Sequence, residues 1–194
     1  MAFSETLETP ILLAAMPQVQ DPFFHESVVL LVHHDEVGSF GLIVNRPTEL
    51  KVADVLRGMK IDWSGNPESL AFFGGPVSPH QGTVLYAAGE SFGIAVEGAS
   101  EIFPGVQTTQ HFADLEALAR KPPSGLRLVL GFAGWGEEQL IDEILRNDWI
   151  TAPVDIDLIF SEEPAKMWTA TLRSVGVDPA SLPSWTKTND GQAN

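Results

Sequence analysis

A series of short residue strings occurs twice in this chain, in the same order. Strings between residues 11 and 60 return between residues 70 and 120, displaced by about 52 to 60 positions: ILLAAMP as LAFFGGP, HESVVL as HQGTVL, SFGLIV as SFGIAV, and VADV as FADL. A period of this length predicts one unit of three strands and a helix per copy. Because one copy cannot bury both faces of its sheet, we expect an α+β fold in which the two copies form a barrel-like, largely antiparallel β core with helices packed outside. Chance similarity of short apolar strings is the alternative.

The first copy shows how these elements follow from the residues. Three mainly apolar segments, at residues 11–15, 27–33 and 39–45, predict three strands, and the second is rich in β-branched side chains. A short helix is expected after Pro47. Its expected N-cap is Thr48, and its apolar side consists of Leu50, Val52, Val55, Leu56 and Met59.

The last third of the chain is organised around residues 126–149. An apolar run is followed by glycines and then by apolar residues at helical spacing, which predicts a strand, a tight turn and a helix. The expected turn contains Gly131, Gly134 and Gly136. Trp135 in this turn and Trp149 after the helix are large enough to anchor both ends of the segment in a core.

Two further elements are expected before the C-terminus. Residues 155–160 (DIDLIF) alternate polar and apolar side chains, which predicts a strand. Pro164 is expected to begin a helix that Gly176 closes. We therefore expect one domain over residues 1–182, with a strand–helix–strand–helix segment over 125–182 and a flexible tail over 183–194.

The charge of the chain argues against several classes of partner. With 26 acidic and 11 basic residues, its formal net charge is -15, and the basic residues are scattered. Nucleic-acid binding requires a basic surface, so direct contact with DNA or RNA is not expected. No apolar run approaches the roughly 20 residues of a membrane helix, so no membrane partner is expected. The absence of cysteine excludes disulfides and fits a cytoplasmic protein.

Four blocks of the sequence resemble the YqgE/AlgH family of bacterial proteins. They are AMPQVQDPFFHESVVLLVHHDEVGSFGLIVNRP, FFGGPV, LGFAGWGEEQLIDEILRNDW and DIDLIF, within a resemblance that runs from about Leu12 to Leu182. The resemblance implies an α+β fold with a duplicated, barrel-like β core in a cytosolic protein whose biochemical activity is not established. It also brings the label of transcriptional regulator, which the family takes from its name-bearing member.

The motif residues that carry this resemblance have structural explanations. Glycines allow positive φ and close packing, prolines punctuate loops, and asparagine tolerates unusual φ at a strand end. We interpret the following residues as structural: Pro17, Pro22, Asn45, Pro47, Gly74, Gly75, Pro76, Gly131, Gly134, Trp135 and Gln139.

No catalytic residue or cofactor is predicted. Residues 89–93 (GESFG) match the G-x-S-x-G elbow of hydrolases, which requires a helix directly after the serine. Residues 94–96 (IAV) favour a strand instead, so a hairpin turn is the better explanation. The glycine-rich stretch 131–136 could present backbone N–H groups to an anion, but Glu137 and Glu138 would repel a phosphate there.

No metal site is predicted either. His33 and His34 are neighbours on an expected strand, where adjacent side chains point to opposite faces and cannot bind one ion together. The other histidines, His25, His80 and His111, lack the spacing of metal ligands. His34 is expected to hydrogen-bond to a neighbouring loop.

The repeat suggests one candidate binding site. If the two copies pack about a pseudo-twofold axis, loops 21–27 and 76–82 occupy equivalent positions. A groove shared by these loops is the expected site. Its candidate residues are Asp21, His25, Ser27, His80 and Gly82.

Three classes of function stay open. The favoured one is a non-enzymatic regulatory protein that binds a small ligand or a protein partner, because the surface is acidic and catalytic groupings are missing. A DNA-associated transcriptional regulator is suggested by the family label and opposed by the charge. An enzyme with an unorthodox site would need a concave pocket whose groups have displaced pKa values.

Overall fold

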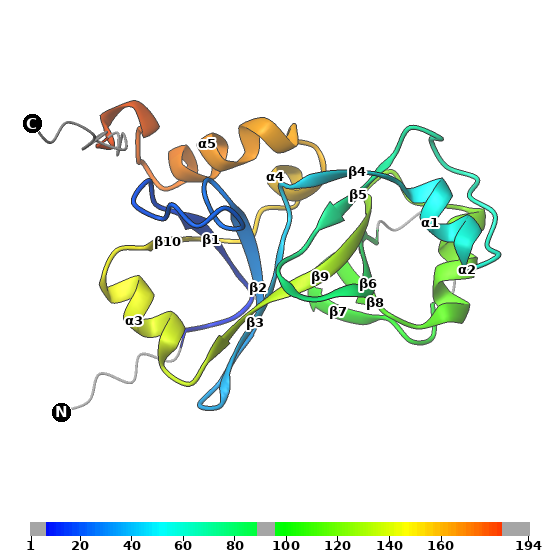
Figure 1. The fold of residues 1–194 in the computed structure, drawn as a ribbon, viewed down its shortest axis with the longest axis horizontal. Helices are drawn as coiled ribbons and strands as arrows, with labels where there is room; N and C mark the ends of the chain where they lie inside the picture. Colours follow the sequence, from blue (N-terminus) through cyan, green and yellow to red (C-terminus); the bar gives the residue numbers. More distant parts are fainter. Residues whose placement is uncertain (1–6, 89–95, 184–194) are drawn as a thin grey trace, which may run out of the picture.

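The computed structural model describes residues 7–88 and 96–183 of the 194-residue chain. Within these ranges the protein has an α+β fold in which ten strands form one strongly twisted, curled sheet with helices outside it (Figure 1). The strands are β1 (Ile11–Ala15), β2 (Val28–His34), β3 (Gly38–Ile43), β4 (Pro47–Lys51), β5 (Leu70–Phe73), β6 (Val77–Ala87), β7 (Ser100–Phe103), β8 (Val106–Thr109), β9 (Leu126–Gly136) and β10 (Trp149–Ala152). The helices are α1 (Val52–Gly58), α2 (Phe112–Arg120), α3 (Gln139–Leu145), α4 (Ile156–Phe160), α5 (Pro164–Ser174) and the 3-10 helix η1 (Pro179–Ser181).

The sheet is largely antiparallel, with β9 in its middle. The strand order is β10-β1-β2-β3-β9-β6-β8-β7, and β5 pairs with both β4 and β9. Among the described pairings, β5 with β9 is parallel. Figure 1 shows β9 crossing from the half of the molecule that contains α3 and α5 to the half that contains α1 and α2.

The strands β1 and β2 are buried on both faces. Leu12 and Leu30 point into a core cluster that also includes residues of α4 and α5. Their neighbours Leu13 and Leu31 point the other way, into a cluster with Leu140 of α3. Because alternate residues of a strand point to opposite faces, a strand covered on both sides needs a nearly continuous apolar run. This explains why both strands were predictable from the sequence.

A third core cluster lies in the other half of the molecule. Leu56 of α1 and Leu118 of α2 pack there with Val84 of β6 and Leu128 of β9. The two helices therefore cover the same part of the sheet, as Figure 1 shows on its right side.

The predicted glycine turn at residues 131–136 is wrong, because β9 continues through all of these residues. Gly131 has φ +72°, and a Cβ there would clash with the backbone of Gly75, which itself has φ +148°. The glycines thus permit close approach of backbones where β9 passes the link between β5 and β6. The turn falls instead at residues 137–138, where Glu138 adopts a left-handed conformation before α3.

The predicted strand at residues 155–160 is also wrong. These residues form α4, because the Asp155 carboxylate caps the helix by accepting hydrogen bonds from the N–H groups of Asp157 (2.9 Å) and Leu158 (3.3 Å). Ile159 is buried in the core beside α5. The helix from Pro164 closed by Gly176, which has φ +80°, agrees with the prediction.

The helix expected after Pro47 begins later than predicted. Residues 47–51 form β4, and α1 begins at Val52. The Thr48 hydroxyl donates to the carbonyl of Ala71 on β5 at 2.8 Å, so it links two strands and does not cap a helix. Leu50 is therefore part of a strand. A strand that the sequence did not predict, β10, begins at Trp149 and pairs with β1.

The internal duplication stays a prediction. The repeated strings VADV and FADL both begin helices, at Val52 and Phe112. The strand pairings of the two copies differ. The first two strands of the first copy, β1 and β2, pair with each other, whereas β5, the first strand of the second copy, pairs with β4 and β9. Much of the third string of the second copy, and with it the GESFG stretch at 89–93, lies outside the described residues.

A buried cation ties the two halves together. Arg127 of β9 is almost fully buried, donates a hydrogen bond to the carbonyl of Val44, and lies 4.4 Å from the centre of the Phe72 ring. Burial lowers the pKa of the Arg127 guanidinium to about 10. Because burial disfavours the charged guanidinium, the charge of Arg127 lowers the stability of the fold at neutral pH. This destabilisation is fully present below about pH 10 and decreases only as the pH rises above that value.

We therefore expect the two substitutions Arg127→Ala and Arg127→Met to differ. The Ala variant leaves a cavity and removes the donor to Val44, and should lose about 2–4 kcal/mol in the free energy of unfolding at pH 7. Met fills most of the volume without a buried charge and should lose clearly less. Urea unfolding followed by circular dichroism measures both. Equal losses for the two variants would show that the charge and its contacts outweigh packing at this position.

Candidate functional site

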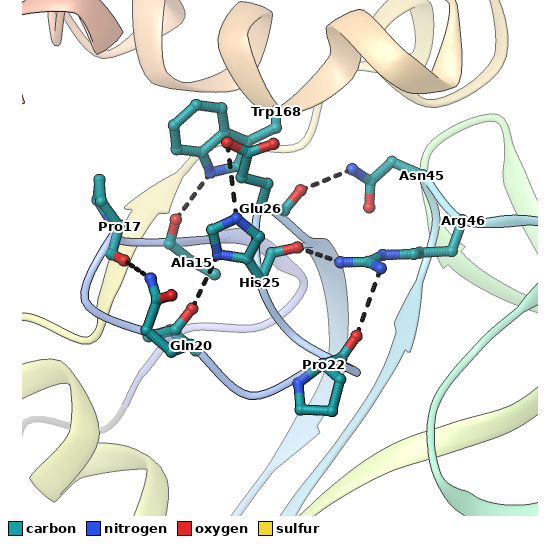
Figure 2. A network of polar contacts seen from close by, with 10 residues as sticks. Ala15, Pro17, Gln20, Pro22, His25, Glu26, Asn45, Arg46 and Trp168 are labelled. Carbon is teal, nitrogen blue, oxygen red and sulfur yellow. Dashed lines mark hydrogen bonds and ion pairs between the residues drawn. The ribbon is translucent and has the colours of Figure 1, made fainter. Parts of the chain in front are cut away.

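Asn45 holds the loop that joins β1 to β2 (residues 16–27). Its side-chain oxygen accepts a hydrogen bond from the N–H of Val28 at 2.8 Å, and its amide nitrogen donates to the carbonyl of Glu26 at 3.0 Å. Figure 2 shows the contact with Glu26. The predicted role at a strand end is therefore incomplete, because the side chain also fixes the end of the loop.

The next residue, Arg46, holds the same loop from the side. Its guanidinium donates to the carbonyls of Pro22, at 3.5 Å, and His25 (Figure 2). The His25 ring contacts the loop itself, with Nδ1 3.1 Å from the carbonyl of Val19 and Nε2 3.9 Å from the carboxylate of Glu26. His25, a candidate for the predicted groove, thus contributes to the internal structure of the loop.

Helix α5 holds the start of the loop. The indole N–H of Trp168 donates to the carbonyl of Ala15 at 2.7 Å, and the Gln20 side chain donates to the carbonyl of Pro17. Figure 2 shows both contacts. The loop therefore has a fixed conformation, which is a requirement for a preformed binding surface.

The carboxylate of Glu143, on α3, is the centre of a second polar network. Glu143 accepts hydrogen bonds from the indole N–H groups of Trp135 and Trp149, both at 2.8 Å, and from the Gln139 amide at 2.9 Å. Gln139 in turn accepts from the N–H of Gly136 at 3.0 Å. These contacts join the end of β9, the helix α3 and the start of β10 into one polar network.

Three aromatic rings lie next to this network. The Trp135 and Trp149 rings meet edge to face at 5.8 Å between centroids. Phe24 of the loop lies 6.2 Å from the Trp135 ring and 5.8 Å from the Trp149 ring. The loop is thus packed on the tryptophans that Glu143 orients.

Between the loop and the tryptophans lies a cavity of about 400 Å³, which we call the loop–tryptophan cleft. Its described lining includes the carboxylates of Asp21, Glu143 and Asp148, and no lysine or arginine. Asp148 forms an ion pair with Arg146 at 3.0 Å. Gly134, Trp135 and Gln139, which carry the family resemblance, line the same cleft.

The residues of the predicted groove lie in different places. Asp21 lines the loop–tryptophan cleft, whereas His80 and Gly82 line a second cavity of about 390 Å³ beside α1 and α2, which we call the helix-pair cavity. The loop expected at residues 76–82 is wrong, because His80 and Gly82 belong to the strand β6. The two cavities have no lining residue in common. Ser27 is fully buried, and its hydroxyl has no hydrogen-bond partner among the described atoms. Neither cavity is therefore formed by both loops.

Sequence reasoning missed Glu143 as a candidate. One signal was present, because Gln139 and Glu143 are four residues apart on a helix and so lie on the same face. The convergence of Trp135 and Trp149 on Glu143 was not predictable, since it depends on β10 pairing with β1.

The clearest pKa shifts of carboxyl and phenol groups occur outside both cavities. A hydrogen bond from His33, at 2.8 Å, and two from the backbone lower the pKa of Asp35 in the β2–β3 turn. Burial, and then the charge of Asp114, raise the pKa of Tyr86. His34 hydrogen-bonds to Ser39 at 2.8 Å across the same hairpin. These groups have structural partners and give no support to a catalytic site.

Residues 7–88 and 96–183 contain neither a cluster of metal ligands nor a helix that could span a membrane. No group of three His, Asp or Glu side chains is placed to hold a metal ion there. No helix in those ranges is both long and apolar enough to cross a membrane.

The fold has relatives among solved structures. The solution structure of the AlgH protein from Pseudomonas aeruginosa matches with a TM-score of 0.72 and 31% identity, covering 92% of this chain and 94% of that one. A crystal structure of a protein from Corynebacterium diphtheriae matches with a TM-score of 0.71 at 22% identity, covering 84% and 85% of the two chains. By architecture, the chain is thus an α+β protein of the AlgH type.

Sequence relatives identify the family. Residues 12–180 match the AlgH-like family. A UPF0301 protein of Myxococcus xanthus is 38% identical over 174 residues, covering 89% of this chain and 93% of the relative. One of Methylococcus capsulatus is 38% identical over 175 residues, covering 89% and 91%. The chain belongs to the YqgE/AlgH family.

The Glu143 network yields a stability prediction. Glu143→Ala removes the acceptor for two buried indole N–H groups and should reduce the free energy of unfolding by about 2–4 kcal/mol. Asp142→Ala, the neighbouring exposed carboxylate on α3, is the matched control and should change it by no more than about 0.5 kcal/mol. Urea unfolding of both variants tests this. A loss shared by both variants would instead indicate a general effect on α3.

Proposed function

We propose that this protein is a non-enzymatic regulatory protein of the cytoplasm, which acts by binding a ligand or protein partner in the loop–tryptophan cleft. We further propose that the cleft binds a cationic group, either on a small molecule or on a side chain of the partner. The observation that carries the proposal is the composition of the cleft: its described lining has an aromatic cluster and the carboxylates of Asp21, Glu143 and Asp148, of which Asp148 is paired with Arg146, and no lysine or arginine.

The chemistry of the cleft suits an ammonium or guanidinium group. Carboxylates attract a cation directly, and the faces of Trp and Phe rings attract it through their quadrupoles, most strongly where water is excluded. Gln18 and Gln20 at the rim add amide groups that can accept hydrogen bonds from the cation. The net charge of -15 would draw cations toward the surface from a distance.

The same charges argue against the DNA-associated alternative. DNA binding needs cations that are available to neutralise phosphates. Five described basic residues already pair with carboxylates at 2.5–3.0 Å: Lys51, Arg57, Arg120, Arg146 and Lys166. The regulator label of the family fits a protein that controls gene expression through a partner without contacting DNA itself.

We expect agmatine, which carries an ammonium and a guanidinium group, to bind in the cleft. ¹H–¹⁵N NMR should show shifts of the Trp135 and Trp149 indole signals during titration, because both N–H groups contact Glu143. The indole of Trp63, which donates to the backbone carbonyl of Asn66 and does not line the cleft, is the internal reference.

Two isosteric variants test the role of charge. Asp21→Asn removes a carboxylate from the cleft and keeps the oxygen that accepts from the N–H of Phe23, so it should weaken agmatine binding about threefold to fivefold. Asp178→Asn removes an equivalent charge outside the cleft, in a residue that accepts from the N–H of Ala180, and should leave binding unchanged. Absence of shifts at millimolar agmatine, or equal effects of both variants, would refute the cationic ligand. Tight binding of duplex DNA at physiological salt would favour the alternative.

A further inference from the structure

The helix-pair cavity is apolar on most of its surface. Its walls come from both helices and from β9, and include Val55, Met59, Phe112, Leu115, Leu128 and Leu130. Phe112 and Met59 are exposed large hydrophobic residues, at 54% and 42% of their full accessible area. A cavity of about 390 Å³ with apolar walls has the usual size and character of a small-molecule site.

A row of hydrogen-bonded polar side chains contributes to the lining of this cavity. The Gln81 amide donates to the side-chain oxygen of Gln110 at 3.0 Å, and the Gln110 amide donates to the hydroxyl of Thr83 at 2.8 Å. Gln81, Gln110 and the nearby His80 line the cavity. The amides of Gln81 and Gln110 thus add hydrogen-bonding groups to a mostly apolar lining.

Gly82 indicates that the volume of the cavity is itself important. Unlike Gly75 and Gly131, it has no positive φ, so a side chain would not be strained there. A Cβ at this position would meet only Leu128 (3.6 Å) and Leu130 (3.9 Å), both at ordinary contact distances. Neither conformation nor crowding therefore requires glycine at position 82. Its effect is to leave free the volume between the strand β6 and the leucines of β9.

The lining determines the class of ligand. Its described members include no Asp, Glu, Lys or Arg, so a charged ligand would have no counterion, and an anion would also be repelled by the net charge of -15. An apolar cavity of about 150 Å³ holds a benzene ring, so 390 Å³ has room for on the order of fifteen carbon atoms.

We propose that the helix-pair cavity is a second binding site, for an uncharged amphipathic molecule. The aliphatic or aromatic body of the ligand packs between Val55, Phe112 and Leu128, and its single hydrogen-bonding group contacts Gln81 or Gln110. This site is independent of the loop–tryptophan cleft, which differs in residues and in charge.

The uncharged fluorescent probe N-phenyl-1-naphthylamine tests this proposal on the full chain. We expect saturable binding of one probe per chain with increased fluorescence, displacement by 1-decanol, and weaker displacement by decanoate. Methyl NMR should place the shifts at Leu128 and Leu130. Absence of saturable binding, shifts confined to other methyl groups, or decanoate competing better than decanol would overturn the proposal.

Matched variants locate the site. Gly82→Leu fills the cavity and should weaken probe binding at least about tenfold while leaving the fold intact. Gly58→Leu adds the same side chain at the end of α1, where a Cβ meets no atom within 4 Å, and should bind the probe like the native chain. If circular dichroism shows that Gly82→Leu does not fold, Val55→Phe fills the cavity from α1 and decides the question. Native-like probe binding by a folded cavity-filling variant would refute the site.

Discussion

The strand β9 is the element on which the rest of the structure depends. One of its edges pairs with β6, and the other pairs first with β5 and then with β3. Its side chains enter all three core clusters, with Val129 in the first, Trp135 in the second and Leu128 in the third. Because β9 pairs with β6 along one edge and with β5 and β3 along the other, and its side chains enter all three clusters, it joins the two halves into one folding unit. Arg127, bound to the end of β3, strengthens the same junction.

Local sequence patterns correctly predicted the strands that are buried along their whole length. They failed where contacts between residues far apart in the sequence determine the structure. The apolar runs of β1 and β2 are unambiguous, since both faces of those strands are covered. At residues 155–160 the alternation suggested a strand, but the capping carboxylate of Asp155 and the position of Ile159 against α5 produce a helix. Gly131 suggested a turn because glycine commonly forms turns, whereas here it lets β9 pass close to Gly75. That approach involves residues far apart in the sequence.

The candidate site was partly predictable for the same reason. Asp21, His80 and Gly82 were predicted to line one shared groove, whereas Asp21 lines one cavity and His80 and Gly82 line another. The prediction of one groove assumed that the two copies pack about a pseudo-twofold axis. In the structure the first segment is a loop and the second is the start of β6, and they line different cavities. Glu143 and Trp149 could be recognised only once α3 and β10 were placed together.

Residues of β9 line both cavities, and the lining chemistry differs between the start and the end of the strand. Near its start, Leu128 and Leu130 give the helix-pair cavity apolar walls without charge. Toward its end, Gly134 and Trp135 face a cleft lined by three carboxylates. β9 is one continuous strand, so both cavities lie along a single element of the sheet. The lining of one is apolar and uncharged, and that of the other is aromatic and acidic, which agrees with the proposed role in recognition.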